Sequence, residues 1–292
     1  MSTNHCFKVG EFECIAVADG TNDYAAKRLF TNAPEDEMAQ ALDKRSLGPD
    51  EIAIPYTCLT VNVNGRWVLV DTGAGVREKA RVGQVVRSLA AAGIDRADIK
   101  LVILTHGHTD HIGGLTDKAG ELRFREAQYV IGKGEWEFWR TKENLIELGW
   151  ESMIPYMEEK LGSIEGRVDL VEGESEILPG LRVIPAEGHT PGHMVVAFSS
   201  EGEELWSTGD ALIHPIHLEH LGWYTVFDLA PEEAIETKLR ILDTVENEVM
   251  IHAFHFPFPG IGRVNREGER WRWRPIEMKG YSKVLSHNRA GG

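Results

Sequence analysis

The pattern of hydrophobic and polar positions predicts a chain that is rich in strands. Residues 7–19 alternate and carry β-forming side chains, so a first strand is expected to end near Asp19-Gly20. Asn64-Gly65 lies between two β-rich runs, which is a strong signal for a two-residue hairpin. The runs expected to form strands after the first are 57–63, 66–71, 99–104, 127–131, 168–171, 181–185, 194–199, 204–208, 249–253 and 270–276.

Helices are predicted where apolar positions return at helical spacing. Residues 77–92 show this spacing and stop at Gly93. Residues 231–246 begin with a proline and an acidic first turn, as helix N-termini prefer, and 35–45 form a shorter acidic helix. The pattern predicts a single domain over 1–292 with an α+β fold. Two sheets pack together with helices outside, as a four-layer α/β/β/α sandwich.

Two segments interrupt this pattern. Residues 21–55 are polar and contain prolines, and a segment of this length between strands is unlike a plain connector. We expect it to form a lid over a functional site, with a surface excursion that contacts no site as the alternative. The polar residues 280–292 are expected to form a frayed tail.

Composition excludes several classes of function. A hydrophobic content of 42% and a charged content of 26% over 292 residues are those of an ordinary globular protein. The net charge of −15 argues against a nucleic-acid-binding face and against adsorption to anionic membranes. Cys6, Cys14 and Cys58 are interpreted as reduced thiols. The chain carries no recognisable export signal, so a cytoplasmic location and a small-molecule substrate are expected.

The most specific chemistry follows the run at 99–104. The stretch LTHGHTDHIGG, residues 104–114, places three imidazoles and one carboxylate within six positions: His106, His108, Asp110 and His111. The carboxyl end of a buried strand is where α/β sheets place their ligands. Imidazole is the commonest metal ligand among side chains, and these groups satisfy one another poorly unless a cation lies among them. We therefore predict a metal site here rather than a solvated polar loop.

Three later loops add candidate ligands, each after a predicted strand. They are EGHTPGH at 187–193, TGD at 208–210 and HAFH at 252–255. The set is too large for one tetrahedral zinc ion and suits two ions that share a carboxylate. Asp71 also ends a strand. It is either a carboxylate that orients a ligand imidazole or the cap of the following helix, and the sequence leaves both open.

The combination of HGHTDH, GHTPGH, TGD and a late histidine resembles the metallo-β-lactamase superfamily over residues 7–276. This resemblance implies the four-layer fold and a two-metal hydrolytic centre. It implies a first metal held by His106, His108 and His193, a second metal held by Asp110, His111 and the late histidine, and Asp210 as the bridge between them.

The late histidine is interpreted as His255, because the FPFPGIG that follows resembles the segment after the last ligand in methyl parathion hydrolase-like members. His252 is expected to be a satisfied histidine near the core. His189, the first histidine of GHTPGH, is expected to support its loop by hydrogen bonding.

Within the superfamily, the chain resembles the lactonases and the methyl parathion hydrolase-like esterases. Flavodiiron members have Glu where this chain has His108, and only 37 residues follow His255, too few for the glutathione-binding region of glyoxalase II. Quorum-quenching lactonases place a Tyr three residues after the bridging Asp, where this chain has Ile213. Tyr224 and His214 are the candidates to replace that Tyr. The residues expected to line the substrate pocket are His214, Trp223, Tyr224, Phe30 and Leu29.

The expected activity is therefore hydrolysis of a lactone or an ester by a metal-bridging hydroxide, with Asp110 passing a proton to the leaving group. The cofactors are two divalent ions, Zn²⁺ first, with Mn²⁺, Co²⁺ or Fe²⁺ as alternatives. A phosphotriesterase, or a mononuclear-iron sulfur (persulfide) dioxygenase of the same fold, are the alternative activities. A homodimer and a monomer both stay open.

Overall fold

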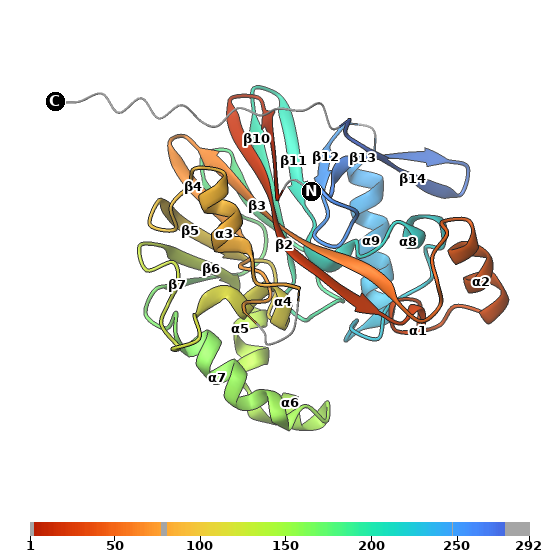
Figure 1. The fold of residues 1–292 in the computed structure, drawn as a ribbon, viewed down its shortest axis with the longest axis horizontal. Coiled ribbons are helices and arrows are strands. Elements are labelled where there is room, and N and C mark those ends of the chain that lie inside the picture. Colours follow the sequence, from red (N-terminus) through yellow and green to blue (C-terminus); the bar gives the residue numbers. More distant parts are fainter. Residues whose placement is uncertain (1–2, 77–80, 247, 278–292) are drawn as a thin grey trace.

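Two sheets form the centre of the molecule. The computed structural model describes residues 3–76, 81–246 and 248–277, and these residues form two seven-stranded sheets and the helices around them (Figure 1). The first sheet contains, in spatial order, β1 (Asn4–Val9), β2 (Phe12–Tyr24), β3 (Ile52–Val63), β4 (Arg66–Val70), β5 (Ile99–Leu104), β6 (Gln128–Gly132) and β7 (Val168–Val171).

The second sheet is built from the C-terminal half of the chain. Strands that follow one another in the chain lie side by side in this sheet. Within the described residues, β11 and β12 are its one parallel pair. Its strands are β8 (Ser175–Leu178), β9 (Leu181–Pro185), β10 (Met194–Ser200), β11 (Glu203–Ser207), β12 (Met250–His252), β13 (Ile261–Glu267) and β14 (Arg270–Pro275).

The helices lie outside the sheets or in the loops at their edges (Figure 1). Those before β7 are α1 (Ala26–Leu29), α2 (Glu35–Asp43), α3 (Val85–Ala91), α4 (Thr109–Ile112), η1 (Gly113–Leu115), α5 (Lys133–Arg140), α6 (Lys142–Glu147), η2 (Glu151–Met153) and α7 (Ile154–Gly162). The later ones are η3 (Gly209–Ala211), α8 (Ile216–Glu219) and α9 (Pro231–Val245).

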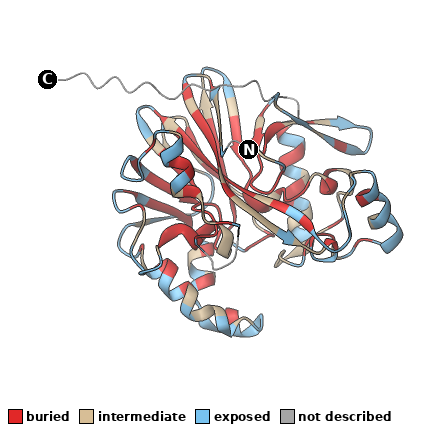
Figure 2. Ribbon diagram, viewed as in Figure 1, coloured by how far each residue is buried: buried red, intermediate tan, exposed pale blue. Residues whose placement is uncertain are grey.

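Three apolar clusters hold these layers together. The inner faces of the two sheets meet through residues such as Leu59, Val61, Val183 and Val196, all buried. A second cluster packs α3, α5 and α7 on the outer face of the first sheet, and a third packs α9 on the outer face of the second. Figure 2 shows buried residues along the strands and exposed residues on the outer sides of the helices. The predicted α/β/β/α sandwich is therefore confirmed.

Most predicted elements are present, and the hairpin is confirmed. β3 and β4 pair in antiparallel fashion, and Asn64 and Gly65 between them have φ angles of 52° and 85°, as a type I′ turn requires. The single strand expected at 7–19 is wrong. The chain turns at Gly10, where φ is 52°, and forms the antiparallel pair β1 and β2.

The helix expected at 77–92 is shorter than predicted. Residues 77–80 lie outside the described residues, and α3 begins only at Val85. Gly83, at a φ of 86°, breaks the helical path, and the buried carboxylate of Asp19 accepts the backbone N–H of Val85. β8 and β13 were not predicted because their sequences are short or rich in polar residues.

The segment 21–55 contains more regular structure than its composition predicts. β2 continues to Tyr24 and β3 starts at Ile52, so the excursion proper covers residues 25–51 and carries α1 and α2. The tail expected at 280–292 lies outside the described residues. Among the described helices, none combines the length and the apolar character needed to cross a membrane.

Candidate metal centre

The loop at 106–111 begins where β5 ends. β5 pairs in parallel with β4 and β6, so it is buried on both faces and its carboxyl end opens at the edge of the sheet. His106 and His111 are fully buried, and His108 and Asp110 are partly exposed. α4 starts directly after His108 and turns Asp110 and His111 toward the second sheet. A buried strand thus delivers four polar side chains to one point.

The second sheet supplies the partners of this loop. Asp210 lies in η3 after β11, and His255 lies in the turn after β12. Two groups of potential ligand atoms result, and within each group the atoms lie within 4.8 Å of one another. The groups are His106, His108, His189 and Asp210, and then Asp110, His111 and His255.

One expected ligand lies elsewhere. His193 belongs to neither group, because its Nε2 accepts the backbone N–H of Asp210 at 3.0 Å. His189 takes the expected place, with its Nε2 3.3 Å from Asp210 Oδ2 and 2.9 Å from His108 Nδ1. The expected roles of His189 and His193 are therefore exchanged in this geometry. The first histidine of GHTPGH faces the cluster and the second supports the loop that carries Asp210.

The two late histidines differ in the same way. His255 presents Nε2 to two carboxylates, at 3.3 Å from Asp210 and 3.5 Å from Asp110. His252 is fully buried, and its Nδ1 lies 2.8 Å from the hydroxyl of Ser207. The geometry therefore groups His255, and not His252, with the loop at 106–111.

The potential ligand atoms of this cluster are placed to bind a cation and do not all satisfy one another by hydrogen bonding. Among the described residues of the cluster, His111 Nε2 and Asp210 Oδ1 face one another and are buried without a hydrogen-bond partner. His111 Nε2 and Asp210 Oδ1 are nevertheless only 3.1 Å apart. Two ligand atoms of one tetrahedral zinc ion are about 3.3 Å apart. Buried polar atoms are almost always paired, so this set matches what a metal centre requires.

The electrostatics of the cluster agree with this fit. Burial lowers the pKa of His106 and His108 well below the usual imidazole value, and neighbouring imidazoles lower it further. Burial opposes ionisation of Asp210, but the nearby His255 and His111 outweigh it and hold the pKa of Asp210 well below its usual value. His111 and His189 differ from these two, because nearby carboxylates outweigh the effect of burial: the pKa of His111 lies well above its usual value, and the pKa of His189 is raised to about 9. A divalent ion bound between Asp210 and these imidazoles would take the place of their protons.

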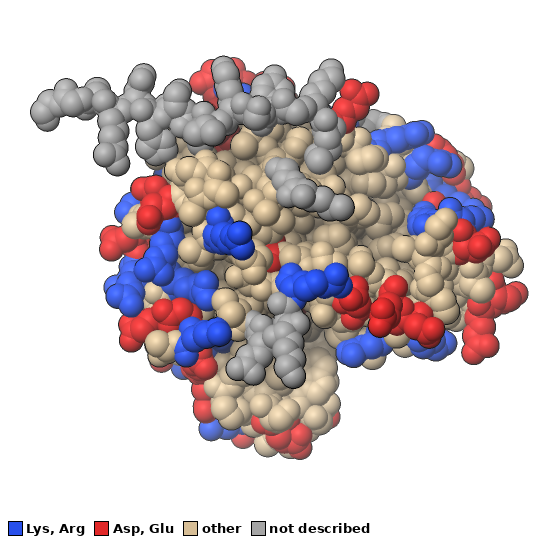
Figure 3. Space-filling view, in the orientation of Figure 1, with Lys and Arg blue, Asp and Glu red and all other residues tan. Residues whose placement is uncertain are grey.

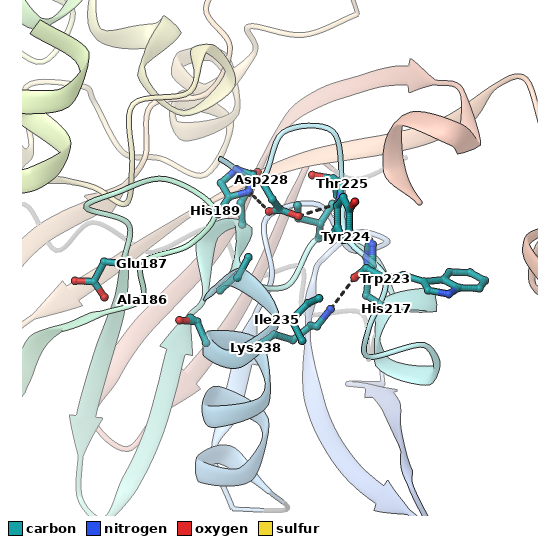
Figure 4. A pocket seen from close by; sticks show the side chains of 15 residues that line it. Ala186, Glu187, His189, His217, Trp223, Tyr224, Thr225, Asp228, Ile235 and Lys238 are labelled. Carbon is teal, nitrogen blue, oxygen red and sulfur yellow. Dashed lines mark hydrogen bonds and ion pairs between the residues drawn. The ribbon is translucent and has the colours of Figure 1, made fainter. Parts of the chain in front are cut away.

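Carboxylates outside the cluster orient its imidazoles. Asp71 Oδ2 lies 2.8 Å from His111 Nδ1, and Asp71 Oδ1 accepts the backbone N–H of Thr105 at 2.8 Å. Among the described helices, the next one after Asp71 is α3, which begins at Val85, so these contacts favour the first of the two interpretations of Asp71, a carboxylate that orients an imidazole. Asp228 holds His189 in the same way, with 2.7 Å between Oδ1 and Nδ1 (Figure 4).

A further carboxylate, which the sequence analysis did not single out, joins the two loops that carry histidines. Glu135 on α5 is fully buried, and its Oε1 accepts the backbone N–H of Gly107 at 2.7 Å and the indole N–H of Trp139. Its Oε2 accepts the hydroxyl of Thr190 at 2.8 Å and the N–H of Gly192 at 3.0 Å. All four donors therefore converge on one side chain between the loops.

The cluster opens onto a cavity of about 330 Å³. Of the residues expected to form the substrate pocket, Leu29 lines this cavity, whereas Phe30 is fully buried and does not line it. The other three residues do not line it. His214 is buried, and its Nδ1 accepts the N–H of Ile216. Trp223 and Tyr224 line a separate small cavity beside Asp228 and Lys238, which Figure 4 shows.

Neither candidate for the missing lactonase tyrosine therefore reaches the main cavity. Ile213 does line it, and Tyr24 at the end of β2 lines it as well. The Tyr24 hydroxyl bonds to the hydroxyl of Tyr56, which packs on His255. The residues of the cavity wall that sequence reasoning missed are Tyr24, Arg28, Ile54, Thr109, Trp139, Trp150, Met153, Met157 and Phe227.

Comparisons with known proteins agree with this geometry. The family model described as "Metallo-beta-lactamase superfamily" matches residues 54–253 and confirms the resemblance seen in the sequence. The N-acyl homoserine lactonase AiiA of Bacillus thuringiensis subsp. kurstaki is 25% identical over 172 residues, which cover 59% of this chain and 61% of that protein. The probable metallo-hydrolase YflN of Bacillus subtilis (strain 168) is 31% identical over 157 residues, 50% of this chain and 56% of its own. The chain thus spans about 61% of the length of the first curated relatives it matches.

Solved structures resemble most of the chain. A structure described as AidC, a dizinc quorum-quenching lactonase, in complex with a product, superposes with a TM-score of 0.88 at 24% identity and covers 96% of this chain and 100% of its own. A structure described as the hydrolase AbOPH in the beta lactamase superfamily superposes with a TM-score of 0.89 at 24% identity. The superposition covers 96% of this chain and 99% of that one. At these identities the likeness shows the fold.

Proposed function

We propose, from the premise that this chain belongs to the metallo-β-lactamase superfamily, that it is a metal-dependent hydrolase that opens a lactone or cleaves an ester. The observation that carries the proposal is the pair of ligand groups at the edge of the two sheets, which open together onto a largely apolar cavity. The lactonases among its relatives support the same reaction class. Such a cavity suits an uncharged carbonyl compound with an apolar substituent.

The proposed ligands follow the two groups. His106, His108 and His189 hold the first ion, and Asp110, His111 and His255 hold the second. Asp210 lies between the groups, since its carboxylate oxygens are 3.3 Å from His189, 3.1 Å from His111 and 3.3 Å from His255. Histidine and carboxylate ligands suit zinc, which is our first choice, and they also accept Mn²⁺, Co²⁺ and Fe²⁺.

When bound, two divalent ions supply an activated water molecule and polarise the oxygen of the scissile carbonyl. The residues of the chain do the rest. Asp110 lines the cavity, so its carboxylate can take a proton from the attacking water and return it to the leaving alkoxide. Asp71 and Asp228 keep the Nδ1 atoms of His111 and His189 occupied, so that each Nε2 faces the cluster.

The Tyr24 hydroxyl is the proposed hydrogen-bond donor to the substrate. Its side chain lines the cavity, whereas the hydroxyl partner Tyr56 is buried. If Tyr56 donates its proton to the Tyr24 oxygen, the Tyr24 proton is free to reach a substrate oxygen. Ile213 adds apolar surface at the position where other lactonases place their tyrosine.

The test is a hydrolysis panel on protein loaded with Zn²⁺, Mn²⁺ or Co²⁺. It contains lactones with short and long acyl chains, aryl esters and phosphotriesters. We expect lactones or esters to give the highest kcat/KM, and His106→Ala to abolish turnover. The intact second group of ligands favours hydrolysis over mononuclear-iron dioxygenase chemistry. Protein that holds two ions per chain and hydrolyses neither lactones nor esters would contradict the proposal, and a preference for phosphotriesters would reassign the substrate.

A further inference from the structure

An arginine lines the main cavity, whose other lining residues are apolar except for Tyr24, Thr109 and the candidate metal ligands. Arg28 belongs to α1, in the excursion between β2 and β3, and its guanidinium carbon lies 4.9 Å from the ring centroid of Phe227. Among the residues that the structure describes, no acidic side chain forms an ion pair with it. It is also the one Lys or Arg among the described residues that line this cavity. Its charge is therefore available to a ligand.

The backbone around Arg28 is held in place. Its carbonyl accepts the N–H of Val226 at 2.9 Å, and the N–H of Thr31 bonds to the carbonyl of Tyr224 at 2.9 Å. These bonds tie α1 to the segment that carries Phe227. The guanidinium stacks on that ring, which reduces the side-chain entropy that a ligand contact would otherwise cost. The arginine is thus preorganised at the cavity wall.

Its distance from the cluster has an upper limit. The Phe227 centroid lies 6.5 Å from that of His108, and the guanidinium carbon lies 4.9 Å from the Phe227 centroid. The guanidinium is therefore no more than about 11.4 Å from the His108 ring. An extended acyl chain of five to eight carbons spans a gap of this order, roughly 1.25 Å per carbon.

We propose that Arg28 binds a carboxylate at the end of the acyl chain opposite the reacting carbonyl. The substrates would then be lactones or esters of acids that carry a second, terminal carboxylate. Guanidinium and carboxylate pair in bidentate fashion, and Arg28 is exposed and therefore accessible to a ligand. Leu29, Ile54 and Met153 on the same cavity wall offer apolar surface to the intervening acyl chain. Since Arg28 is the one Lys or Arg among the described residues of the cavity wall, it is the cationic side chain of this wall that can bind an anion. This proposal rests on the proposed hydrolase function.

The first experiment measures kcat/KM on the full-length, metal-loaded protein. The substrates are the p-nitrophenyl monoesters of glutaric, adipic and suberic acid, each compared with the neutral p-nitrophenyl alkanoate of equal chain length. We expect at least one anionic ester to be preferred. Arg28→Met should lower kcat/KM for that ester about ten-fold and change the neutral ester by less than about two-fold, and Arg28→Lys should retain part of the preference. Lys27→Met, next in the chain and outside the cavity wall, is the matched control.

The second experiment separates this proposal from the proposed function. Calorimetry compares the binding of glutarate, adipate and suberate with that of the matching alkanoates, on metal-loaded wild type and on Arg28→Met. Tighter binding of a dicarboxylate, lost in the variant, supports the Arg28 site even if no ester is hydrolysed. An equal loss for both esters in the first experiment, or equal binding of both acids by the wild type, would mean that Arg28 only packs on Phe227 and would overturn the proposal.

Discussion

Single atoms decide which side chains belong to the cluster. Both histidines of GHTPGH are buried and lie within one turn of chain, yet one nitrogen of His193 is committed to a backbone N–H while His189 Nε2 faces Asp210. At the scale of single residues, burial and nearby charges also decide the pKa of His189. Burial lowers the tendency of His189 to ionise, but its hydrogen bonds to Asp210 and Asp228 outweigh this and raise its pKa to about 9.

His189 and His193 are therefore expected to respond differently to substitution. His189→Ala should lose about one metal ion per chain, because a three-ligand site rarely keeps its ion once one ligand is removed. His193→Ala should still hold two ions at saturating zinc, with a free energy of unfolding lower by roughly 1–3 kcal/mol, since the buried N–H of Asp210 loses its acceptor. Elemental analysis of dialysed protein and urea unfolding check these outcomes. The opposite pattern of metal loss would restore His193 as the ligand.

At the scale of elements, side chains from helices fix the loops around the cluster by hydrogen bonds to their backbone. α5 is short, but its Glu135 reaches both histidine-bearing loops, and its Trp139 also forms part of the cavity wall. α9 does the same for the segment at 223–228 from the other side, because Lys238 Nζ donates to the carbonyl of Trp223 at 2.9 Å (Figure 4).

Glu135→Gln is expected to weaken the first metal site selectively. The amide NH₂ of glutamine cannot accept the N–H and O–H groups that one carboxylate oxygen accepts now. Metal affinity at the site of His106, His108 and His189 should fall about 10–100-fold, while the second site changes little. Stepwise titration with a competing chelator and the visible spectrum of the Co²⁺ form measure this. Glu137→Gln, an exposed position on the same helix, is the control, and equal weakening of both sites would argue against a positioning role.

Lys238 is expected to make stability depend on pH. Burial lowers its pKa to about 8, so between pH 8 and 10.5 the unfolded chain binds the proton and the folded chain does not. Over this window the wild type should gain stability relative to Lys238→Met, by roughly 3 kcal/mol in total, and below pH 8 the difference should be constant. Urea unfolding of both proteins from pH 7 to 10.5 tests this. A difference that does not change with pH would mean that the folded and unfolded pKa values are equal.

At the scale of the whole molecule, the cluster joins the two sheets. The loop at 106–111 follows β5 of the first sheet, and Asp210 and His255 follow β11 and β12 of the second. On the face in Figure 3, basic side chains are interspersed with acidic ones.

Removal of the metal is therefore expected to destabilise the whole domain. Ions that bind only the folded state add stability in proportion to the logarithm of their free concentration over Kd, so two well-filled sites should add roughly 10 °C or more to Tm. Scanning calorimetry before and after chelation, with zinc added back, measures this shift. His106→Ala should show a smaller shift. A change below about 2 °C would indicate that the ions do not link the sheets.

The sequence by itself determined the features that depend on local order along the chain. Alternation and the Asn64-Gly65 turn predicted the hairpin of β3 and β4, and the apolar run at 99–104 predicted a buried strand that ends in candidate metal ligands. These follow from backbone geometry and burial, which neighbouring residues reveal. The motifs also indicated the superfamily, which the family match confirms.

Only the tertiary structure decided which distant groups meet. The choice between His189 and His193 depends on where the N–H of Asp210 lies, and the cavity wall depends on how 25–51 and 223–228 fold against each other. Tyr24, Arg28 and Glu135 carry no local signal, because their roles come from contacts with residues far along the chain. Such contacts arise from the packing of the whole domain.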